Sequence, residues 1–538
     1  MPSDCISFKE TGYFSKLICD YLEQQKDLQS FYNHFPSLEN VDAQITEKQQ
    51  SFTTENRKTL SEALLQQYSA TQTSDNTLKN IQLLAEENTF TITTGHQLNL
   101  FTGPLYFLYK IISTINFTER AKKEYPQYNF VPIYWMATED HDFLEINHFQ
   151  LHGKKIAWNN EKGLDNNNGY VGEYTNEGLE EVFAVFEEEL GIGNNAAYLK
   201  SLFKKGYLEH TNLTDATRYI VNELFNSYGL VIVDGNDFAL KKLFIPVLKQ
   251  ELQTQSSFTE VSATTQKLND LGFNAQVTPR EINLFYGKQG LRARIETSGN
   301  GYKVVDHEIK WDSFEAIQKE YTEFPERFSP NVILRPVYQE VILPNLCYIG
   351  GGGELAYWFQ LKASFKSFDI PFPMLLLRNS ALLISKKQSN KIDKLKLSPQ
   401  ELFLKSSSLI NYKVRQISDI KIDFSAQKNQ LKNQFIELKE IAKQTDITFL
   451  NAVNAQEVKQ IKGLENLEKR LLKAQRIKLS DQVSRLTELQ NSLFPLQNLQ
   501  ERKLNFSEFY LEYGDSLIET LKKELDPFKG AFSIITLP

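Results

Sequence analysis

Cysteine is scarce in this sequence, and long uninterrupted hydrophobic runs are absent. The 538 residues include 3 cysteines, which are far apart and odd in number. This excludes a disulfide framework and a cysteine-rich zinc site. The longest apolar stretch, 100–115, contains glycine, proline and lysine and is shorter than the roughly 20 residues of a membrane span. The N-terminus has no signal-peptide pattern. We therefore expect a cytoplasmic protein without a membrane partner.

An excess of positive charge is also missing. The formal net charge is -7, which gives no general reason to bind polyanions, so nucleic acid is not an expected partner. The hydrophobic content of 41% is enough for a large core. Because the chain is longer than one domain of about 100–200 residues, we expect two or three domains.

Proline is absent between Pro399 and Pro495, and Gly463 is the one glycine there. Leucines recur every seven residues at Leu472, Leu479, Leu486 and Leu493. Such a repeat predicts two long helices in an antiparallel coiled coil. We expect its apolar seam to exceed what the hairpin can cover, which predicts a homodimer. A helix pair lying on the core is the alternative.

Short apolar runs alternate with helical segments in the first two thirds of the chain. The runs are 88–94, 129–137, 229–235 and 373–380. This alternation predicts an α/β fold with a parallel sheet covered on both sides. The expected divisions are a helical N-terminal layer (1–85), a catalytic core (86–385) with insertions at about 153–210 and 255–330, a coiled coil (386–500), and a C-terminal helix and strand (501–538) that return to the core.

One group of polar and turn-forming residues lies where the first predicted strand ends and a helix begins. It consists of Gly95, His96, Gln97, Thr102, Gly103 and Pro104. With Pro104 as the first helical residue and Gly103 before it, the free N–H groups of the helix start would favour a phosphate or carboxylate. An ordinary strand-to-helix turn without a ligand is the alternative.

A second group follows the next predicted strand. Glu139, Asp140, His141, Asp142, Glu145 and His148 place carboxylates and imidazoles close together in the sequence. Such a group can bind a metal, act as a base or hold an ammonium group. Helix capping by solvated acids is the alternative.

A third group combines glycines with charged residues. The run Gly350, Gly351, Gly352 and Gly353 is followed by Glu354, and it indicates backbone that approaches a ligand closely. A flexible loop is the alternative. Arg335 and Arg378 lie near strand ends, where each could bind a phosphate or carboxylate bidentately. Ser380 is a candidate binding residue beside Arg378.

Five segments, in this order, resemble the bacillithiol biosynthesis cysteine-adding enzyme (cysteine ligase) family. They are TGHQLNLFTGPLYFLYK, VPIYWMATEDHDFLEINH, LRPVYQEVILPNLCYIGGGGELAYW, LLLRNS and the predicted coiled coil. The resemblance implies a Rossmann-like core similar to class I aminoacyl-tRNA synthetases and a coiled coil used in dimerisation. It implies a reaction that joins L-cysteine to glucosaminyl malate in the last step of bacillithiol biosynthesis.

Amide formation from a free carboxylate needs an activated carboxylate, so ATP or ADP is the expected nucleotide, while metal binding stays open. The catalytic candidates are His96, Asp140 and His141. In place of the synthetase signature His-Ile-Gly-His the chain has Phe101-Thr102-Gly103-Pro104, and Lys-Met-Ser-Lys-Ser has no clear copy. Two other functions remain as alternatives: a metal-dependent hydrolase built on residues 139–142 with His148, and a non-catalytic coiled-coil interaction protein.

Overall fold

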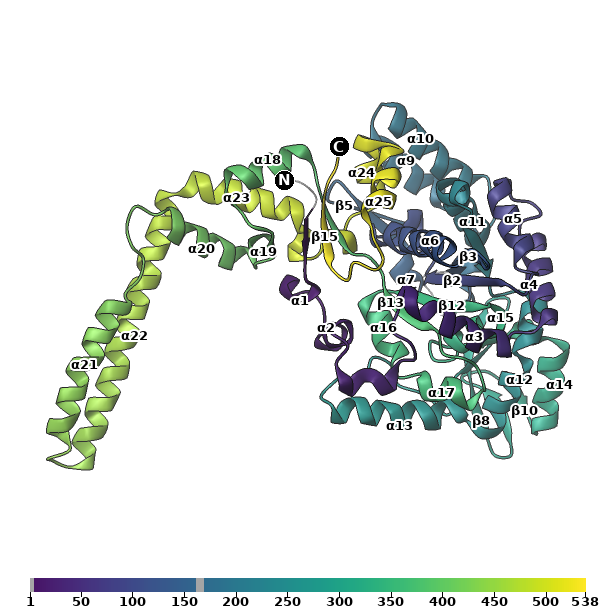
Figure 1. Ribbon diagram of the computed structural model, residues 1–538, viewed down its shortest axis with the longest axis horizontal. Coiled ribbons are helices and arrows are strands. Elements are labelled where there is room, and N and C mark those ends of the chain that lie inside the picture. Colours follow the sequence, from purple (N-terminus) through teal and green to yellow (C-terminus); the bar gives the residue numbers. More distant parts are fainter. Residues whose placement is uncertain (1–3, 161–168) are drawn as a thin grey trace. The chain divides into compact units, whose positions relative to one another are not determined.

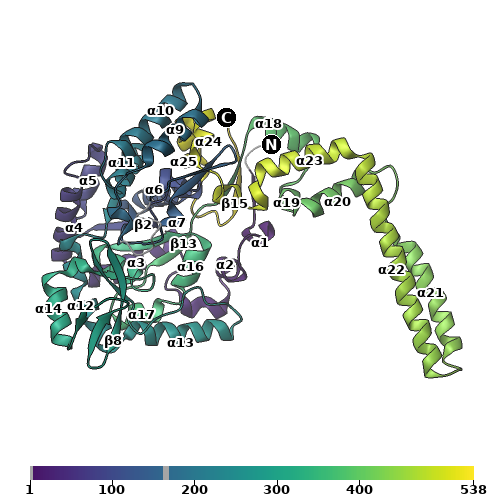
Figure 2. The same ribbon diagram turned by 180° about the vertical axis from the view of Figure 1, so that it is seen from behind.

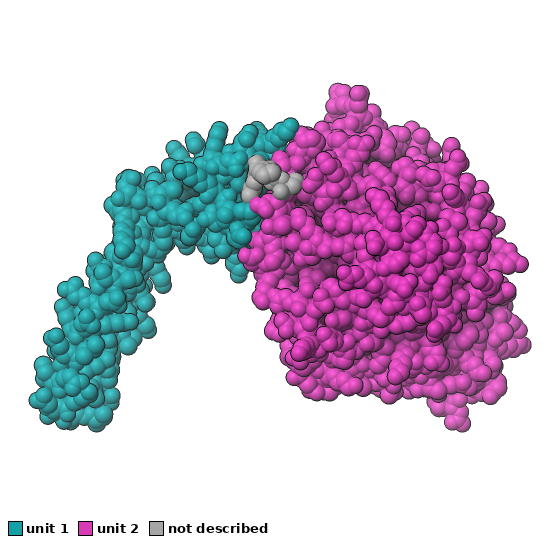
Figure 3. Space-filling model, viewed as in Figure 1, with its two compact units in different colours: residues 1–2, 384–499 teal, residues 3–383, 500–538 magenta. Residues whose placement is uncertain are grey.

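The computed structural model describes residues 4–160 and 169–538. Residues 161–168, part of the first predicted insertion, lie outside the described residues. The described residues divide into two compact units, one of residues 4–160, 169–383 and 500–538 and one of residues 384–499 (Figure 3). Within the described ranges, no helix is both long and apolar enough to cross a bilayer.

The larger unit is built around a five-stranded parallel sheet. Its order is β13 (Met374–Leu377), β12 (Asn345–Gly350), β2 (Thr89–His96), β3 (Asn129–Met136) and β6 (Val231–Asp234). The four predicted strands are confirmed. Strand β12, which leads directly into the glycine run at 350–353, was not among the predicted strands.

Both faces of this sheet are covered by helices (Figures 1 and 2). All eight residues of β2 are buried, as expected for a strand between two helical layers. Helix α6 (Tyr106–Glu124) follows β2 and packs against β2, β3 and β12. Strand β2 has β3 on one side and β12, a later strand, on the other, so the order of the strands reverses at β2 while all strands stay parallel. The predicted α/β, Rossmann-like class is confirmed.

The segment between β2 and α6 differs from the prediction. Helix α6 begins at Tyr106, so the placement of Pro104 as the first helical residue is wrong. Before it, Phe101, Thr102 and Gly103 all have positive φ, at 46°, 66° and 63°. The Asn505 amide donates to the carbonyl oxygens of Phe101 and Gly103, at 2.7 and 2.6 Å. These contacts hold a tight turn against the C-terminal part of the chain.

A second sheet lies between β6 and β12 in the sequence. Its strands, all antiparallel to their neighbours, are β10 (Lys310–Trp311), β9 (Gly301–Val304), β8 (Leu291–Ser298), β7 (Leu284–Lys288) and β11 (Phe328–Pro330). Near the C-terminus, the strand expected in FSIITL is β15 (Phe532–Thr536). It pairs antiparallel with β1 (Asp4–Ile6), which is one edge of a three-stranded sheet completed by β14 (Ala381–Ile384).

The smaller unit is helical. Its main helices are α20 (Ser406–Ile417), α21 (Ser425–Ala442), α22 (Ile447–Lys478) and α23 (Ser480–Leu493). Helices α21 and α22 lie side by side (Figures 1 and 2) around Phe435, Ala442 and Val453. The seven-residue leucine series spans the break between α22 and α23, where Leu479 lies.

The leucine series is covered by another part of the same chain, whereas the prediction was that a second subunit would cover it. Leu472, Leu486 and Leu493 are buried within the chain. Helix α20 packs against both α22 and α23 and supplies buried side chains of its own, including Leu409 and Val414. The expectation that this seam needs a second subunit to cover it is therefore corrected, because α20 lies on it.

Candidate functional site

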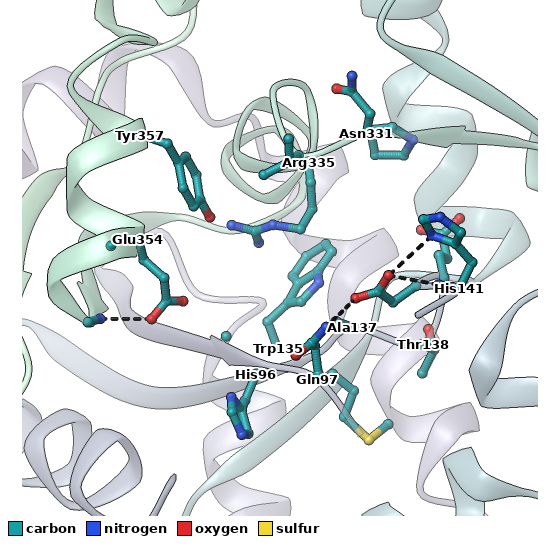
Figure 4. Close-up of a pocket in the computed structure, with 18 of the residues that line it drawn as sticks. His96, Gln97, Trp135, Ala137, Thr138, His141, Asn331, Arg335, Glu354 and Tyr357 are labelled. Atoms are coloured by element: carbon teal, nitrogen blue, oxygen red, sulfur yellow. Dashed lines mark hydrogen bonds and ion pairs between the residues drawn. The ribbon is translucent and has the colours of Figure 1, made fainter. Parts of the chain in front are cut away.

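A cavity of about 640 Å³ opens at the carboxyl ends of β2, β3 and β12. In parallel sheets this is where ligands bind, beside the strand at which the order reverses. The predicted residues that line it are Gly95, His96, Gln97, Glu139, Asp140, His141, Arg335, Gly351, Gly352, Gly353, Glu354 and Arg378. Figure 4 shows Glu354 and Tyr357 at one end and His141 at the other, with Trp135 and Arg335 between them.

The remaining predicted residues lie outside the cavity lining. They are Thr102, Gly103, Pro104, Asp142, Glu145, His148, Gly350 and Ser380. Asp142 accepts a hydrogen bond from the Glu145 backbone and caps the short helix α7 (Phe143–Ile146), as the capping alternative proposed. His148 is the first residue of β4 (His148–Leu151), and its Nδ1 lies 3.0 Å from Oδ1 of Asn147.

The Glu354 end of the cavity is held by an ion pair between the buried Lys110 and the partly exposed Glu354. Lys110 Nζ lies 2.6 Å from Glu354 Oε2. Glu354 also accepts from the Gly351 N–H, at 2.7 Å, and from the Tyr348 hydroxyl, at 2.8 Å. Burial by itself raises the pKa of Glu354, but the Lys110 charge and these donors lower it to about 2. The carboxylate is therefore ionised and fully engaged at neutral pH.

His96 is neutral at this site. Burial and the Lys110 charge hold its pKa well below the usual range. Its ring contacts the rings of Tyr106 and Phe107, and Nε2 is buried without a hydrogen-bond partner among the described residues. An uncharged imidazole with an unpartnered nitrogen can form a hydrogen bond with a ligand, but it does not supply a positive charge.

Arg335 is the first residue of α15 (Arg335–Ile342), and its guanidinium lies over the rings of Trp135 and Tyr348. One terminal nitrogen donates to Gln339, at 3.1 Å, and the other is buried without a partner. Among the described residues, no carboxylate lies within 4.0 Å of it. Arg335 is thus a fixed cation with one terminal nitrogen, Nη2, free to donate to an anionic group.

Arg378 is more fully engaged. It forms a buried ion pair with Glu501 at 2.8 Å and donates to Asn379 O and to Ser380 Oγ, which gives Ser380 a structural role. Only its Nε is unpartnered. Because Glu501 already balances its charge, Arg378 contributes less to an anion site than Arg335 does.

At the other end, Asp140 and His141 lie beside the β2 terminus. Asp140 accepts from the Gln97 amide at 2.8 Å and from the His141 N–H at 2.7 Å. Although burial opposes it, hydrogen bonds from His141 and Gln97 lower the pKa of Asp140, so it is ionised. His141 Nδ1 lies 3.4 Å from Asp140 Oδ1 and 2.9 Å from Arg292 Nη1. Since arginine only donates, Nδ1 of His141 accepts, and a neutral ring then carries its hydrogen on Nε2.

Glu139 points to a different partner, because its Oε1 lies 2.5 Å from the buried Lys241 ammonium. The acidic residues after β3 therefore do not converge on one point. Across residues 4–160 and 169–538, no group of three or more His, Cys, Asp or Glu side chains is arranged to hold a metal ion. The described geometry therefore does not support a metal site built on residues 139–142 with His148.

Several lining residues were missed in the sequence. They are Tyr106, Lys110, Trp135, Tyr348, Tyr357, Arg280, Arg292, Arg294 and Arg502. The sequence contained a pattern that could have identified three of these residues, Lys110, Arg292 and Arg294. Lys110 interrupts an apolar helical run, and Arg292 and Arg294 alternate with apolar residues in LRARIE, which places both on one face of a strand.

Two family models together match nearly the whole chain. Residues 1–379 match the family described as bacillithiol biosynthesis BshC, N-terminal Rossmann-like domain. Residues 381–537 match its C-terminal coiled-coil domain. A chain from Campylobacter jejuni described as an arginyl tRNA synthetase aligns with 80% of this chain and 100% of its own length, at 12% identity and a TM-score of 0.22, which is too low to support an argument.

Curated relatives span the full chain. A protein of Christiangramia forsetii is 58% identical over 100% of this chain and 99% of its own, and one of Flavobacterium johnsoniae is 55% identical over 100% of both. A protein of Cytophaga hutchinsonii is 36% identical over 97% of this chain and 96% of its own. All three carry the name "Putative cysteine ligase BshC". The resemblance seen in the sequence is confirmed, and the chain belongs to the bacillithiol biosynthesis BshC family.

Proposed function

We propose that this enzyme joins L-cysteine to glucosaminyl malate through an amide bond, as the last step of bacillithiol biosynthesis. The names of the relatives support the ligase class. The observation that carries the proposal is the cationic cavity beside β2, where the strand order reverses. There, Arg292 and Arg335 have no carboxylate partner within the described part of the chain, although the whole sequence has a net charge of -7. Both proposed substrates bear carboxylates, which such cations bind.

The cysteine carboxylate has to be activated before an amine attacks it, and we propose ATP as the source of that activation. The cavity fits an anionic group of this kind at Arg335, whose unpartnered terminal nitrogen would donate to a phosphate or carboxylate oxygen. Gly351, Gly352 and Gly353 line the cavity nearby and leave room for close approach. When bound, ATP would convert the carboxylate oxygen into a leaving group.

The attacking amine must lose a proton, and we assign this role to His141. Its side chain is 53% exposed, and Asp140 Oδ1 lies 3.4 Å from its Nδ1. An ionised carboxylate there would stabilise the imidazolium formed when Nε2 takes the proton. In this structure Nδ1 accepts from Arg292, so the ring hydrogen is on Nε2. Proton acceptance at Nε2 therefore requires that Arg292 move away and that the ring hydrogen shift to Nδ1, where Asp140 would accept it.

One assay tests the ligase proposal. Purified protein is incubated with L-cysteine, glucosaminyl malate and ATP, and the thiol product is detected by mass spectrometry. We expect product that depends on the protein and on ATP, together with ADP or AMP. Product formed at the same rate without nucleotide would contradict the ATP proposal alone. No product under any condition would contradict the ligase function.

No observation favours the other functions. A metal-dependent hydrolase would show stoichiometric metal in protein purified without chelators, and a scaffold without catalysis would bind neither substrate. A homodimer in the cytoplasm, acting on small molecules, completes the proposal. Its assembly is tested below.

A further inference from the structure

The β7–β8 hairpin presents arginines to the cavity. In its antiparallel register Phe285 pairs with Arg294 and Gly287 pairs with Arg292. Paired residues lie on the same face of a sheet, as do residues two apart in a strand. Phe285, Arg292 and Arg294 accordingly share one face, and all three line the cavity. The opposite face carries Tyr286, which packs on Trp311 and Phe328.

Arg292 is held in place from two sides. Its guanidinium carbon lies 3.8 Å from the Phe285 ring centroid, and Nη1 donates to His141 Nδ1 at 2.9 Å. Its Nε is buried without a partner. Gly287 leaves space on this face that the Tyr170 hydroxyl fills, because a Cβ built at Gly287 would lie 2.0 Å from Tyr170 Oη. The hairpin surface is therefore packed and fixed, apart from the donors that face the cavity.

The nearby acids do not neutralise Arg292. Glu139 is paired with Lys241, and Asp140 accepts from Gln97 and from the His141 backbone. Among the described residues, no carboxylate oxygen lies within 4.0 Å of the Arg292 guanidinium. Arg294, two residues on, has a half-exposed carboxylate of Glu296 at 3.6 Å. The half-buried Arg292 guanidinium therefore keeps an unpartnered N–H donor and has no anionic partner among the described residues, so it is suited to bind an anionic ligand.

We propose that Arg292, supported by Arg294, binds the malyl dicarboxylate of the acceptor and so determines acceptor selectivity. This inference rests on the ligase function proposed above. In glucosaminyl malate the reacting amine and the malyl group are attached to neighbouring carbons of the sugar. A base for the amine and a cation for the malyl group must then be adjacent, and His141 and Arg292 are in contact. Binding of the carboxylate would also draw Arg292 away from His141 Nδ1.

The test compares two acceptors that carry the same amine. One is glucosaminyl malate and the other is methyl glucosaminide, which lacks both carboxylates. For Arg292→Gln we expect kcat/KM with glucosaminyl malate to fall about 10- to 100-fold, mainly through KM, since one charge-assisted contact is lost. With methyl glucosaminide kcat/KM should not fall, because this acceptor has no malyl carboxylate to lose and none to draw Arg292 away from His141 Nδ1. Arg292→Lys should fall between, because it keeps the charge but loses the planar fork.

Lys288→Gln is the matched control, because it removes a positive charge from the same hairpin at a residue outside the cavity lining. It should leave both acceptors unchanged. Equal losses on both acceptors for Arg292→Gln, or no loss, would overturn the assignment. Calorimetric binding of glucosaminyl malate separates the two proposals. If the wild type binds it without ligation and Arg292→Gln weakens binding, the ligase function fails and the dicarboxylate site stands. If the wild type ligates while Arg292→Gln binds equally well, only the dicarboxylate site fails.

Discussion

The Lys110 ammonium lies 2.6 Å from the Glu354 carboxylate and so connects the segments that follow β2 and β12, the neighbouring strands at which the strand order reverses. Lys110 belongs to α6, which follows β2, whereas Glu354 belongs to α16 (Gly352–Trp358), which follows β12. Lys110 also donates to the Gly95 carbonyl oxygen at 2.7 Å. One buried cation thus fixes the β2 terminus and the glycine-rich turn relative to each other, and it forms one end of the cavity.

Removal of Lys110 should therefore destabilise the protein. Lys110→Met leaves Glu354 with two donors and no cation, and we expect a loss of about 2 kcal/mol in the free energy of unfolding, less than for a fully buried pair because Glu354 is 28% exposed. Chemical denaturation measures this. The double variant Lys110→Met/Glu354→Gln should recover part of the loss, since no charge is left unpaired. Additive losses would show that the two residues are not coupled.

The same pair predicts a dependence on pH. The folded-state pKa of Glu354 is lowered from 4.5 to about 2, so its contribution to stability is complete above pH 4.5 and is lost as the pH falls toward 2. The stability difference between the wild type and Glu354→Gln should therefore shrink between pH 5 and pH 3, in unfolding measured at each pH. A difference that stays constant over this range would contradict the assigned ionisation.

The sequence predicted the sheet and the edge where the cavity lies because apolar runs and polar strand ends are local patterns. Gly95, His96, Asp140 and Glu354 were identified in this way. Tertiary contacts decided the rest. Gly103 was expected at a ligand, yet Asn505, more than 400 residues later, covers that turn. The arginines of β8 reach the cavity through a second sheet, whose position relative to the first no local pattern specifies.

Variants at the Asp140 end should lose activity rather than stability. His141 has a half-exposed side chain, so His141→Ala should lower the melting temperature by no more than a few degrees while thiol formation falls about 100-fold or more. Asp140→Asn should also abolish thiol formation. Steady-state assays and thermal melts measure both effects. A large fall in melting temperature for both variants would support a capping role for this segment instead.

Homodimer formation remains a prediction, on a surface other than the leucine series. Exposed apolar side chains remain on α22, including Ile447 (68% exposed) and Val458 (52%). Their spacing is about three helical turns, so they share a face. We expect light scattering at micromolar concentration to show a dimer, and Ile447→Glu/Val458→Glu to shift it to a monomer with unchanged helix content. Gln460→Glu, also exposed on α22, is the control. A monomeric wild type would exclude the dimer.

Gly103 provides the last test, because its role is structural in this fold. Its φ is +63°, and a Cβ there would lie 2.6 Å from the Asn99 Cβ. Gly103→Val should then cost about 3 kcal/mol or more in the free energy of unfolding, since backbone strain and overpacking add. Gly299 has a similar φ of +61° with nothing within 4 Å, so Gly299→Val should cost only about 1–2 kcal/mol of strain. Denaturant unfolding measures both, and the folded Gly103→Val protein should bind glucosaminyl malate as the wild type does. If Gly103→Val were no less stable than Gly299→Val yet lost substrate binding, the turn would be part of the ligand site after all.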